Sequence, residues 1–199
     1  MDVALSSLLA LLSTLVAIPL VRNIALKYGM VDVPGGRKQH EEPVPPVGGV
    51  VVFSVLILVT ILFQSFTKTG FPPALYFSLG IILVVGIIDD IHTIPARLKF
   101  LVHFLVAGIL VMWGGAKITF LGNLLGFGTI YLDWMVVPFS IACVVYIINA
   151  VNMMDGLDGL AGGNAVIVFS WFGLAAYMTG NTAALGEIAV LLSCILGFL

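Results

Sequence analysis

The chain has 199 residues, of which 61% are hydrophobic and only 9% are charged, and its mean hydropathy is +1.20. Soluble domains carry roughly a quarter charged residues, so this composition excludes an ordinary soluble domain and predicts an integral membrane protein. The formal net charge of −2 gives no general attraction to nucleic acid, and we expect no nucleic-acid partner.

Uncharged apolar runs follow one another along the chain, and most of them approach the ~20 residues that a membrane-spanning helix needs. Six predict full spans: Val3–Val21, Pro43–Thr67, Thr69–Ile88, Phe100–Ala116, Trp134–Met154 and Gly159–Gly186. A seventh run opens at Ile188 and reaches only to Leu199, which is too short to cross a membrane. We therefore expect an all-α, polytopic transmembrane helix bundle, in which residues 1–199 form a single membrane domain truncated at its C-terminal end.

The basic residues predict which side of the membrane each loop faces. Consecutive spans place two of the eight Lys and Arg residues, Lys68 and Lys117, on one side. The other six lie on the opposite side: Arg22, Lys27, Arg37, Lys38, Arg97 and Lys99. The positive-inside rule makes that side cytoplasmic and puts the N-terminus outside. In the outer segment 114–133, glycines between β-branched and aromatic residues predict a small hairpin or a surface-lying loop.

Two groups of polar residues end spans on the cytoplasmic side. Asp89 and Asp90 end the third span. The fifth span ends in a row of amides and acids at three-residue spacing: Asn149, Asn152, Asp155 and Asp158. Acids at membrane depth tend to mark substrate or ion paths, although an aspartate at a helix end can also be simply solvated. Because both spans end at the same face, the two groups can meet.

The row after the fifth span has the chemistry of a cation site. Residues three apart are neighbours on a helix, but a row of nine residues drifts about half a turn, so the helix must bend or end. The glycines at 156, 159, 162 and 163 supply that freedom. Carboxylate and amide oxygens suit Mg²⁺, with Mn²⁺ as an alternative, and Mg²⁺ suits a phosphate substrate. The other interpretation is a polar helix cap followed by turn glycines.

Basic residues near these span ends can either set the orientation of the protein in the membrane or bind a substrate. The loop between the first two spans, rich in proline and glycine, carries Arg37, Lys38 and His40, whose side chains could hold a phosphate or a nucleotide. The alternative is that these cations only set the topology, since the positive-inside rule and the attraction to anionic lipids also place Lys and Arg beside cytoplasmic span ends. Lys99 lies near the start of the fourth span, where an ammonium can meet a lipid phosphate.

The motifs RKQH followed by PVPPVGG, GIIDD at a span end, and NAVNMMDGLDGLAGG together carry a resemblance over the whole chain. They resemble the polyprenyl-phosphate N-acetylhexosamine-1-phosphate transferases of glycosyltransferase family 4, and within them the bacterial undecaprenyl-phosphate N-acetylglucosamine-1-phosphate transferases. The resemblance implies transfer of a sugar 1-phosphate from a UDP-N-acetylhexosamine to a membrane polyprenyl phosphate, with release of UMP. It also implies dependence on Mg²⁺, a multi-pass protein of the cytoplasmic (inner) membrane, and an active site facing the cytoplasm.

The resemblance also implies roles for single residues. Asn152 matches the metal-binding asparagine, and Asp89 and Asp90 match the acid pair that binds metal or removes a proton. Asp155 and Asp158 match catalytic positions near the nucleotide and the diphosphate. The expected substrate-binding residues are Asn149, Lys99 for the lipid phosphate, and Lys38 and His40 in a loop over the nucleotide. Direct attack by the lipid phosphate and prior attack by an aspartate both fit these residues.

Two further motifs of the family do not occur between Met1 and Leu199. These are a second metal-binding aspartate in a Phe-x-Gly-Asp sequence and a later substrate-binding loop, so we expect residues 1–199 to be inactive alone. A homodimer and a role in making lipopolysaccharide, teichoic acid or another envelope polymer are further expectations. The alternatives are a phospho-N-acetylmuramoyl-pentapeptide transferase, an intramembrane prenyltransferase and a proton-coupled transporter.

Overall fold

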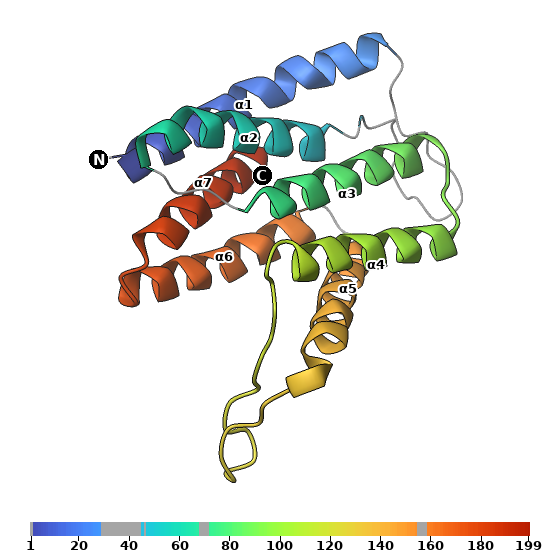
Figure 1. The fold of residues 1–199 in the computed structure, drawn as a ribbon. Helices are drawn as coiled ribbons and strands as arrows, with labels where there is room; N and C mark the ends of the chain where they lie inside the picture. The colour runs from blue at the N-terminus through green and yellow to red at the C-terminus, as the bar shows by residue number, and fades with distance from the viewer. Residues whose placement is uncertain (1, 29–44, 46, 68–71, 155–158) are drawn as a thin grey trace. The chain divides into compact units, whose positions relative to one another are not determined.

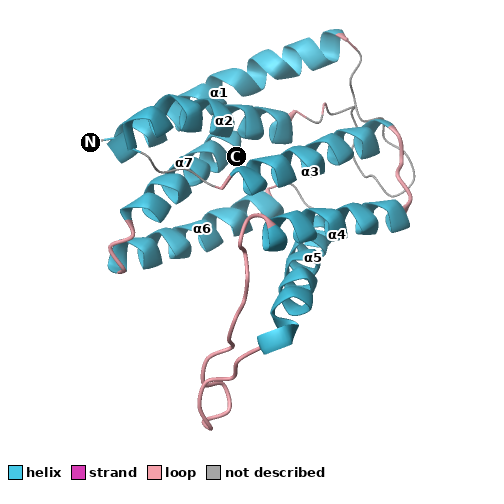
Figure 2. Cartoon of the chain, viewed as in Figure 1, coloured by secondary structure: helices cyan, strands magenta, loops and turns pink. Residues whose placement is uncertain are grey.

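A computed structural model of the chain describes residues 2–28, 45, 47–67, 72–154 and 159–199 (Figure 1). Over these residues the chain forms α-helices and one 3-10 turn, joined by turns and loops (Figure 2). The elements are α1 (Asp2–Lys27), α2 (Gly48–Thr67), α3 (Pro73–Ile91), α4 (Ala96–Met112), η1 (Asp133–Met135), α5 (Val136–Met154), α6 (Leu160–Met178) and α7 (Thr182–Phe198). The predicted all-α helix bundle is confirmed.

Several of these helices have the length and composition of membrane spans. In the described part of the chain, four helical segments are long and apolar enough to cross a membrane: Val3–Lys27, Pro73–Ile91, Asp133–Met154 and Leu160–Met178. Two shorter apolar helices cover Gly48–Phe63 and Thr182–Phe198. The protein is therefore a multi-pass membrane protein, while the number of full spans, expected to be six, stays a prediction.

The helices group into two compact units, and the first combines Met1–Phe71, Gly86–Thr93 and Leu157–Leu199. Within it, α1 packs against α2 and α7, and α7 also contacts α2 and α6. Small side chains let these helices approach closely, as is usual in membranes. A Cβ atom added at Gly197 would lie 2.9 Å from the Cβ of Thr14 and 3.0 Å from the carbonyl oxygen of Leu11. The contact between α1 and α7 therefore requires glycine at 197.

The boundary between α6 and α7 differs from the one expected from hydropathy. The uncharged run to Gly186 is broken, because α6 ends at Met178 and α7 begins at Thr182. Gly180 adopts a left-handed conformation with φ 69°, and the Asn181 side chain accepts a hydrogen bond of 3.1 Å from the Ala184 amide, which caps α7. The seventh helix is thus 17 residues long rather than a short stub from Ile188.

The second unit combines Pro72–Val85 and Ile94–Gly156, and so holds most of α3 together with α4, η1 and α5. The start of α3 packs against the residues that follow α4, where the rings of Phe77 and Trp113 meet edge to face at 6.1 Å. Helix α4 also contacts α5. The two helices α3 and α4 are therefore antiparallel in this unit, and the first turn of α4 lies at the far end from the loop after Met112. That both units form a single membrane domain stays a prediction.

The expected hairpin lies between α4 and η1, and an antiparallel bridge between Phe120 and Tyr131 pairs its two arms. Its base is tied to α5 by Ser140, which is 1% exposed. The Ser140 hydroxyl donates a hydrogen bond of 2.6 Å to the Val136 carbonyl and accepts one of 2.8 Å from the Ile118 amide. This loop is therefore a defined element attached to the start of the fifth helix.

Candidate active site

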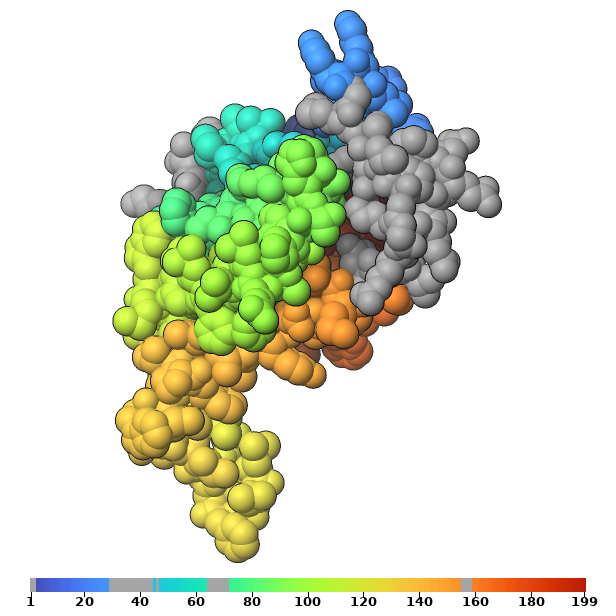
Figure 3. Space-filling view, turned by 90° about the vertical axis from the view of Figure 1, so that its right-hand side faces the viewer, coloured from blue at the N-terminus to red at the C-terminus, as the bar shows by residue number. Residues whose placement is uncertain are grey.

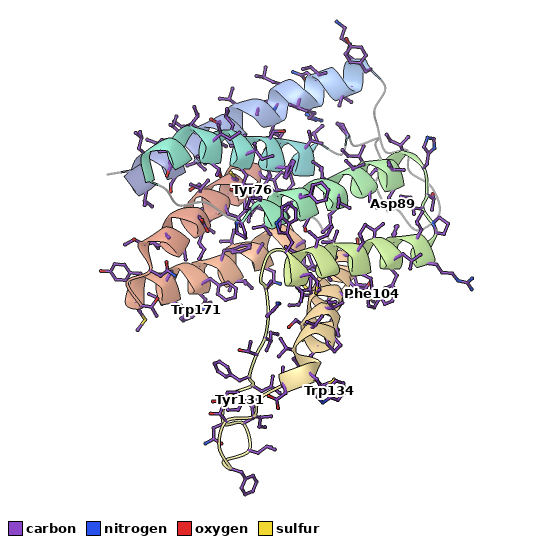
Figure 4. The ribbon with its side chains drawn as sticks, in the orientation of Figure 1. Tyr76, Asp89, Phe104, Tyr131, Trp134 and Trp171 are labelled. Atoms are coloured by element: carbon purple, nitrogen blue, oxygen red, sulfur yellow. The ribbon has the colours of Figure 1, made fainter. Side chains whose placement is uncertain are left out.

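The acid pair closes α3, whose preceding residues are apolar. Asp89 and Asp90 lie in the last turn and are half-buried, and Figure 4 shows Asp89 at this end of the helix. Successive helix residues point about 100° apart, so the two carboxylates leave the helix in different directions and can serve different partners. The C-terminal end of a helix carries partial negative charge, which adds to the attraction of these carboxylates for a cation.

The amide pair occupies the last described turn of α5. Asn149 is half-buried and its Nδ2 donates to the Met153 sulfur at 3.8 Å, whereas Asn152 is exposed. Three-residue spacing puts the two amides on the same side of the helix. The exposed amide oxygen of Asn152 is a hard ligand of the type that Mg²⁺ accepts.

Cationic groups gather at the start of α4. Lys99 lies in the first turn and is half-buried, and Arg97 is exposed beside it. The N-terminal end of a helix favours anions, so this turn has the electrostatics of a phosphate contact. One turn further, the Nδ1 atom of His103 is buried and has no hydrogen-bond partner among the described residues. The sequence signal for His103 is its position four residues after Lys99, on the same side of the helix.

Some of the predicted site residues fall in different units. Asn149, Asn152 and Lys99 belong to the second unit, whereas Asp89 and Asp90 belong to the first. The predicted meeting of the acid and amide pairs therefore stays a prediction. Among the residues that the structure describes, no group of three or more His, Cys, Asp or Glu side chains could hold a metal ion. Four of the predicted residues lie outside the described ranges: Lys38, His40, Asp155 and Asp158.

Comparison with known proteins supplies the family. Residues 72–199 match the family model described as glycosyl transferase family 4. The chain is 34% identical over 197 residues to a protein of Bacillus subtilis (strain 168) named probable undecaprenyl-phosphate N-acetylglucosaminyl 1-phosphate transferase, covering 99% of this chain and 54% of that protein. It is 34% identical to the decaprenyl-phosphate N-acetylglucosaminephosphotransferase of Mycolicibacterium smegmatis, covering 83% of this chain and 43% of that protein.

A third relative is the undecaprenyl-phosphate alpha-N-acetylglucosaminyl 1-phosphate transferase of Yersinia pestis. It is 32% identical over 168 residues, which cover 80% of this chain and 43% of that protein. The chain thus spans about half the length of the curated relatives that it matches. Because the family model covers residues 72–199, more than half of the chain, the chain belongs to glycosyl transferase family 4.

Proposed function

We propose that the full-length protein transfers N-acetylglucosamine 1-phosphate from UDP-N-acetylglucosamine to a membrane polyprenyl phosphate and releases UMP. The observation that carries this proposal is the 34% identity over 197 residues to the B. subtilis relative, whose name states the sugar phosphate and the lipid acceptor. In this reaction an oxygen of the lipid phosphate bonds to the phosphorus next to the sugar, and the bond from that phosphorus to UMP breaks. The product is a polyprenyl diphosphate sugar.

The polar helix ends support a Mg²⁺ site in the full-length protein. The donors are hard oxygens at helix ends: the carboxylates of Asp89 and Asp90 and the amide of Asn152. When bound there, Mg²⁺ would neutralise charge on two phosphate groups that otherwise repel each other. Mn²⁺ is the expected substitute, since it accepts the same oxygen ligands.

Several residues would act on the substrates directly. An aspartate can take the last proton from the lipid phosphate, and the pair Asp155 and Asp158 is proposed to lie beside the diphosphate together with Asn149. The ammonium of Lys99 is proposed to contact the lipid phosphate. Lys38 and His40 are proposed to cover the nucleotide. Residues 1–199 alone are expected to be inactive, because the Phe-x-Gly-Asp sequence that the resemblance implies for a second metal-binding aspartate does not occur among them.

The distribution of basic residues also supports a side of the membrane for the proposed active site. The excess of Lys and Arg at the end of α1, in the segment that follows it and at the start of α4 favours a cytoplasmic active site in the inner membrane. A donor made in the cytoplasm and a lipid acceptor in the membrane would meet there, at the first membrane step of an envelope polymer such as lipopolysaccharide or teichoic acid. A homodimer is a further part of the proposal.

Membranes containing the full-length protein test this function. UMP should be released from UDP-N-acetylglucosamine only when Mg²⁺ and polyprenyl phosphate are both present. Asp89→Asn should lower kcat by on the order of 10²–10³, the loss typical when a group stabilising transition-state charge is removed. Asp155→Ala should abolish product formation, and full activity of that variant would contradict its place in the site.

The matched control is Asp133→Asn. Asp133 is an exposed acid in η1 with φ 42°, a conformation that asparagine adopts readily. The control variant should therefore fold normally and keep wild-type activity. If Asp133→Asn lowered kcat as much as Asp89→Asn does, removing any acidic charge would impair the protein. The effect of Asp89→Asn would then no longer support a role for Asp89 in the site.

A further inference from the structure

The loop between α4 and η1 projects from the ends of its helices (Figure 1) and forms a narrow extension of the second unit in the space-filling view (Figure 3). Its tip carries three large apolar side chains that are exposed to solvent, Leu124, Leu125 and Phe127. The Phe127 side chain is 95% exposed, which is unusual for a large aromatic residue. We refer to residues 118–132 as the hairpin.

The hairpin is built to hold these side chains outward. Backbone hydrogen bonds pair its two arms, from the Leu121 amide to the Ile130 carbonyl at 2.9 Å and from the Ile130 amide to the Gly122 carbonyl at 3.1 Å. At the tip, the Gly128 amide donates to Asn123 Oδ1 at 2.9 Å. These bonds join the two arms and close the tip, while the apolar side chains at the tip stay exposed.

The charge pattern of the hairpin is that of a surface in contact with lipid. Residues 118–132 contain no charged side chain, and the charged residues Lys117 and Asp133 stand just outside them. A protein interface usually has a polar rim around its apolar centre, whereas the tip of this hairpin has no charged residue around its apolar side chains, and charge is confined to Lys117 and Asp133 beside the base. Tyr131 and Trp134 lie at the base (Figure 4), where amphipathic rings typically mark the level of lipid headgroups.

The position of the hairpin brings it to the membrane. Residues 133–154 form one of the helical segments that are long and apolar enough to span a bilayer, so the hairpin ends where a span begins. Two side chains beside it, Met112 and Trp113 at the end of α4, are also exposed and apolar. The apolar surface therefore continues from these helices onto the hairpin, and the charged residues between them are Lys117 and Asp133.

We propose that the hairpin is a membrane anchor, which inserts Leu124, Leu125 and Phe127 into the headgroup and acyl boundary of the leaflet next to the end of α4. Exposed apolar patches mark interaction sites, and a lipid surface is the partner already adjacent to this one. This inference is independent of the catalytic proposal, since it concerns the membrane face opposite to the first turn of α4.

Site-directed spin labelling of the full-length protein tests this anchor. Nitroxides are attached to Leu124→Cys and Phe127→Cys, with Lys117→Cys as the matched position at the charged base, in a background carrying Cys143→Ala and Cys194→Ala. The proteins are placed in vesicles of phosphatidylethanolamine and phosphatidylglycerol, with the water-soluble nickel relaxation agent on both sides. Labels at 124 and 127 should collide more with oxygen than with nickel, and the label at 117 more with nickel.

Two results would overturn the proposal. Nickel access at 124 and 127 equal to that at 117 would place the tip in water, and protection from both reagents would place it against protein, such as a second copy. If the background without cysteines does not fold, a photo-reactive benzoylphenylalanine replaces Phe127 in the natural sequence. Cross-links to phospholipid would then support the anchor, and cross-links to protein, or none, would contradict it.

Discussion

Lys99 and Arg97 stand in the same turn of α4 but differ in their surroundings. Lys99 is half-buried and Arg97 is exposed, and residues two apart on a helix do not face the same way. A juxtamembrane cation required only by topology works equally well at either position. A cation that binds the lipid phosphate must instead stand at one defined place, which the proposed function assigns to Lys99.

Neutralising the two side chains separately tests this assignment. Lys99→Gln should raise the KM for polyprenyl phosphate roughly tenfold to a hundredfold, because a hydrogen bond to a charged group contributes about 1.5–3 kcal/mol. Arg97→Gln should leave this KM nearly unchanged. Steady-state UMP release at varied lipid concentration measures the KM of both variants. Equal effects of the two substitutions would mean that Lys99 only helps to set the topology and does not bind the lipid phosphate.

In the first unit, the packing of α7 against α1 depends on which positions along α7 are occupied by glycine. In α7, a Cβ atom at Gly197 would meet backbone and side-chain atoms of α1 at 2.9–3.0 Å, whereas one at Gly186 would meet only the Val3 side chain at 3.5 Å. Both glycines face α1 from the same helix. Only at Gly197 is α1 too close to leave room for a methyl group.

Alanine at these two positions should therefore have opposite effects. Gly197→Ala should destabilise the protein by about 1–3 kcal/mol, the usual cost of overpacking. Gly186→Ala should be neutral or slightly stabilising, because alanine favours helix more than glycine does. Unfolding of the purified full-length protein in mixed detergent micelles compares them, and equal stability of the two variants would argue against a close contact between α1 and α7.

Hydropathy predicts the helices better than it predicts their ends or contacts. The apolar runs identify the helices well, because a membrane span needs length and few charges. The turn at Gly180 and Asn181 is invisible to this criterion, since both residues are uncharged, and only their backbone conformation and capping bond separate α6 from α7. The role of Ser140 in holding the hairpin is not predicted from hydropathy either. One hydroxyl inside an apolar run says nothing of the distant Ile118 amide that it binds.

The candidate site was predictable in its chemistry rather than in its geometry. Asp89 and Asn152 could be singled out because polar oxygen donors are rare in such an apolar chain and both lie at span ends. How these donors approach each other depends on helix packing, which sequence spacing along a single helix does not encode. Their residue types suit a cation, and the packing of the helices sets the distance between them.

At the scale of the whole molecule, the distribution of basic residues predicts the orientation that the proposed function needs. Tyr28, beside Lys27 at the end of α1, should face the cytoplasm, and Thr119 in the hairpin should face outward. Neither residue is a lysine or an arginine, so replacing it leaves the basic residues that set the topology intact.

Cysteine labelling in intact cells checks this orientation. With Cys143 and Cys194 replaced by alanine, Thr119→Cys should react with a membrane-impermeant maleimide. Tyr28→Cys should react only after the cells are permeabilised. The reverse pattern would put the acid and amide pairs on the outer face, away from a cytoplasmic nucleotide sugar, and would contradict the proposed setting.

The most direct measurement of function is the identity of the lipid product when donors compete. Membranes with the full-length protein receive polyprenyl phosphate, Mg²⁺ and equal amounts of UDP-N-acetylglucosamine and UDP-N-acetylmuramoyl-pentapeptide, and the lipids are analysed by mass spectrometry. We expect polyprenyl diphosphate N-acetylglucosamine, formed together with UMP and lost in the Asp89→Asn variant. A muramoyl-pentapeptide lipid, or no Mg²⁺-dependent sugar lipid at all, would contradict the function proposed for this protein.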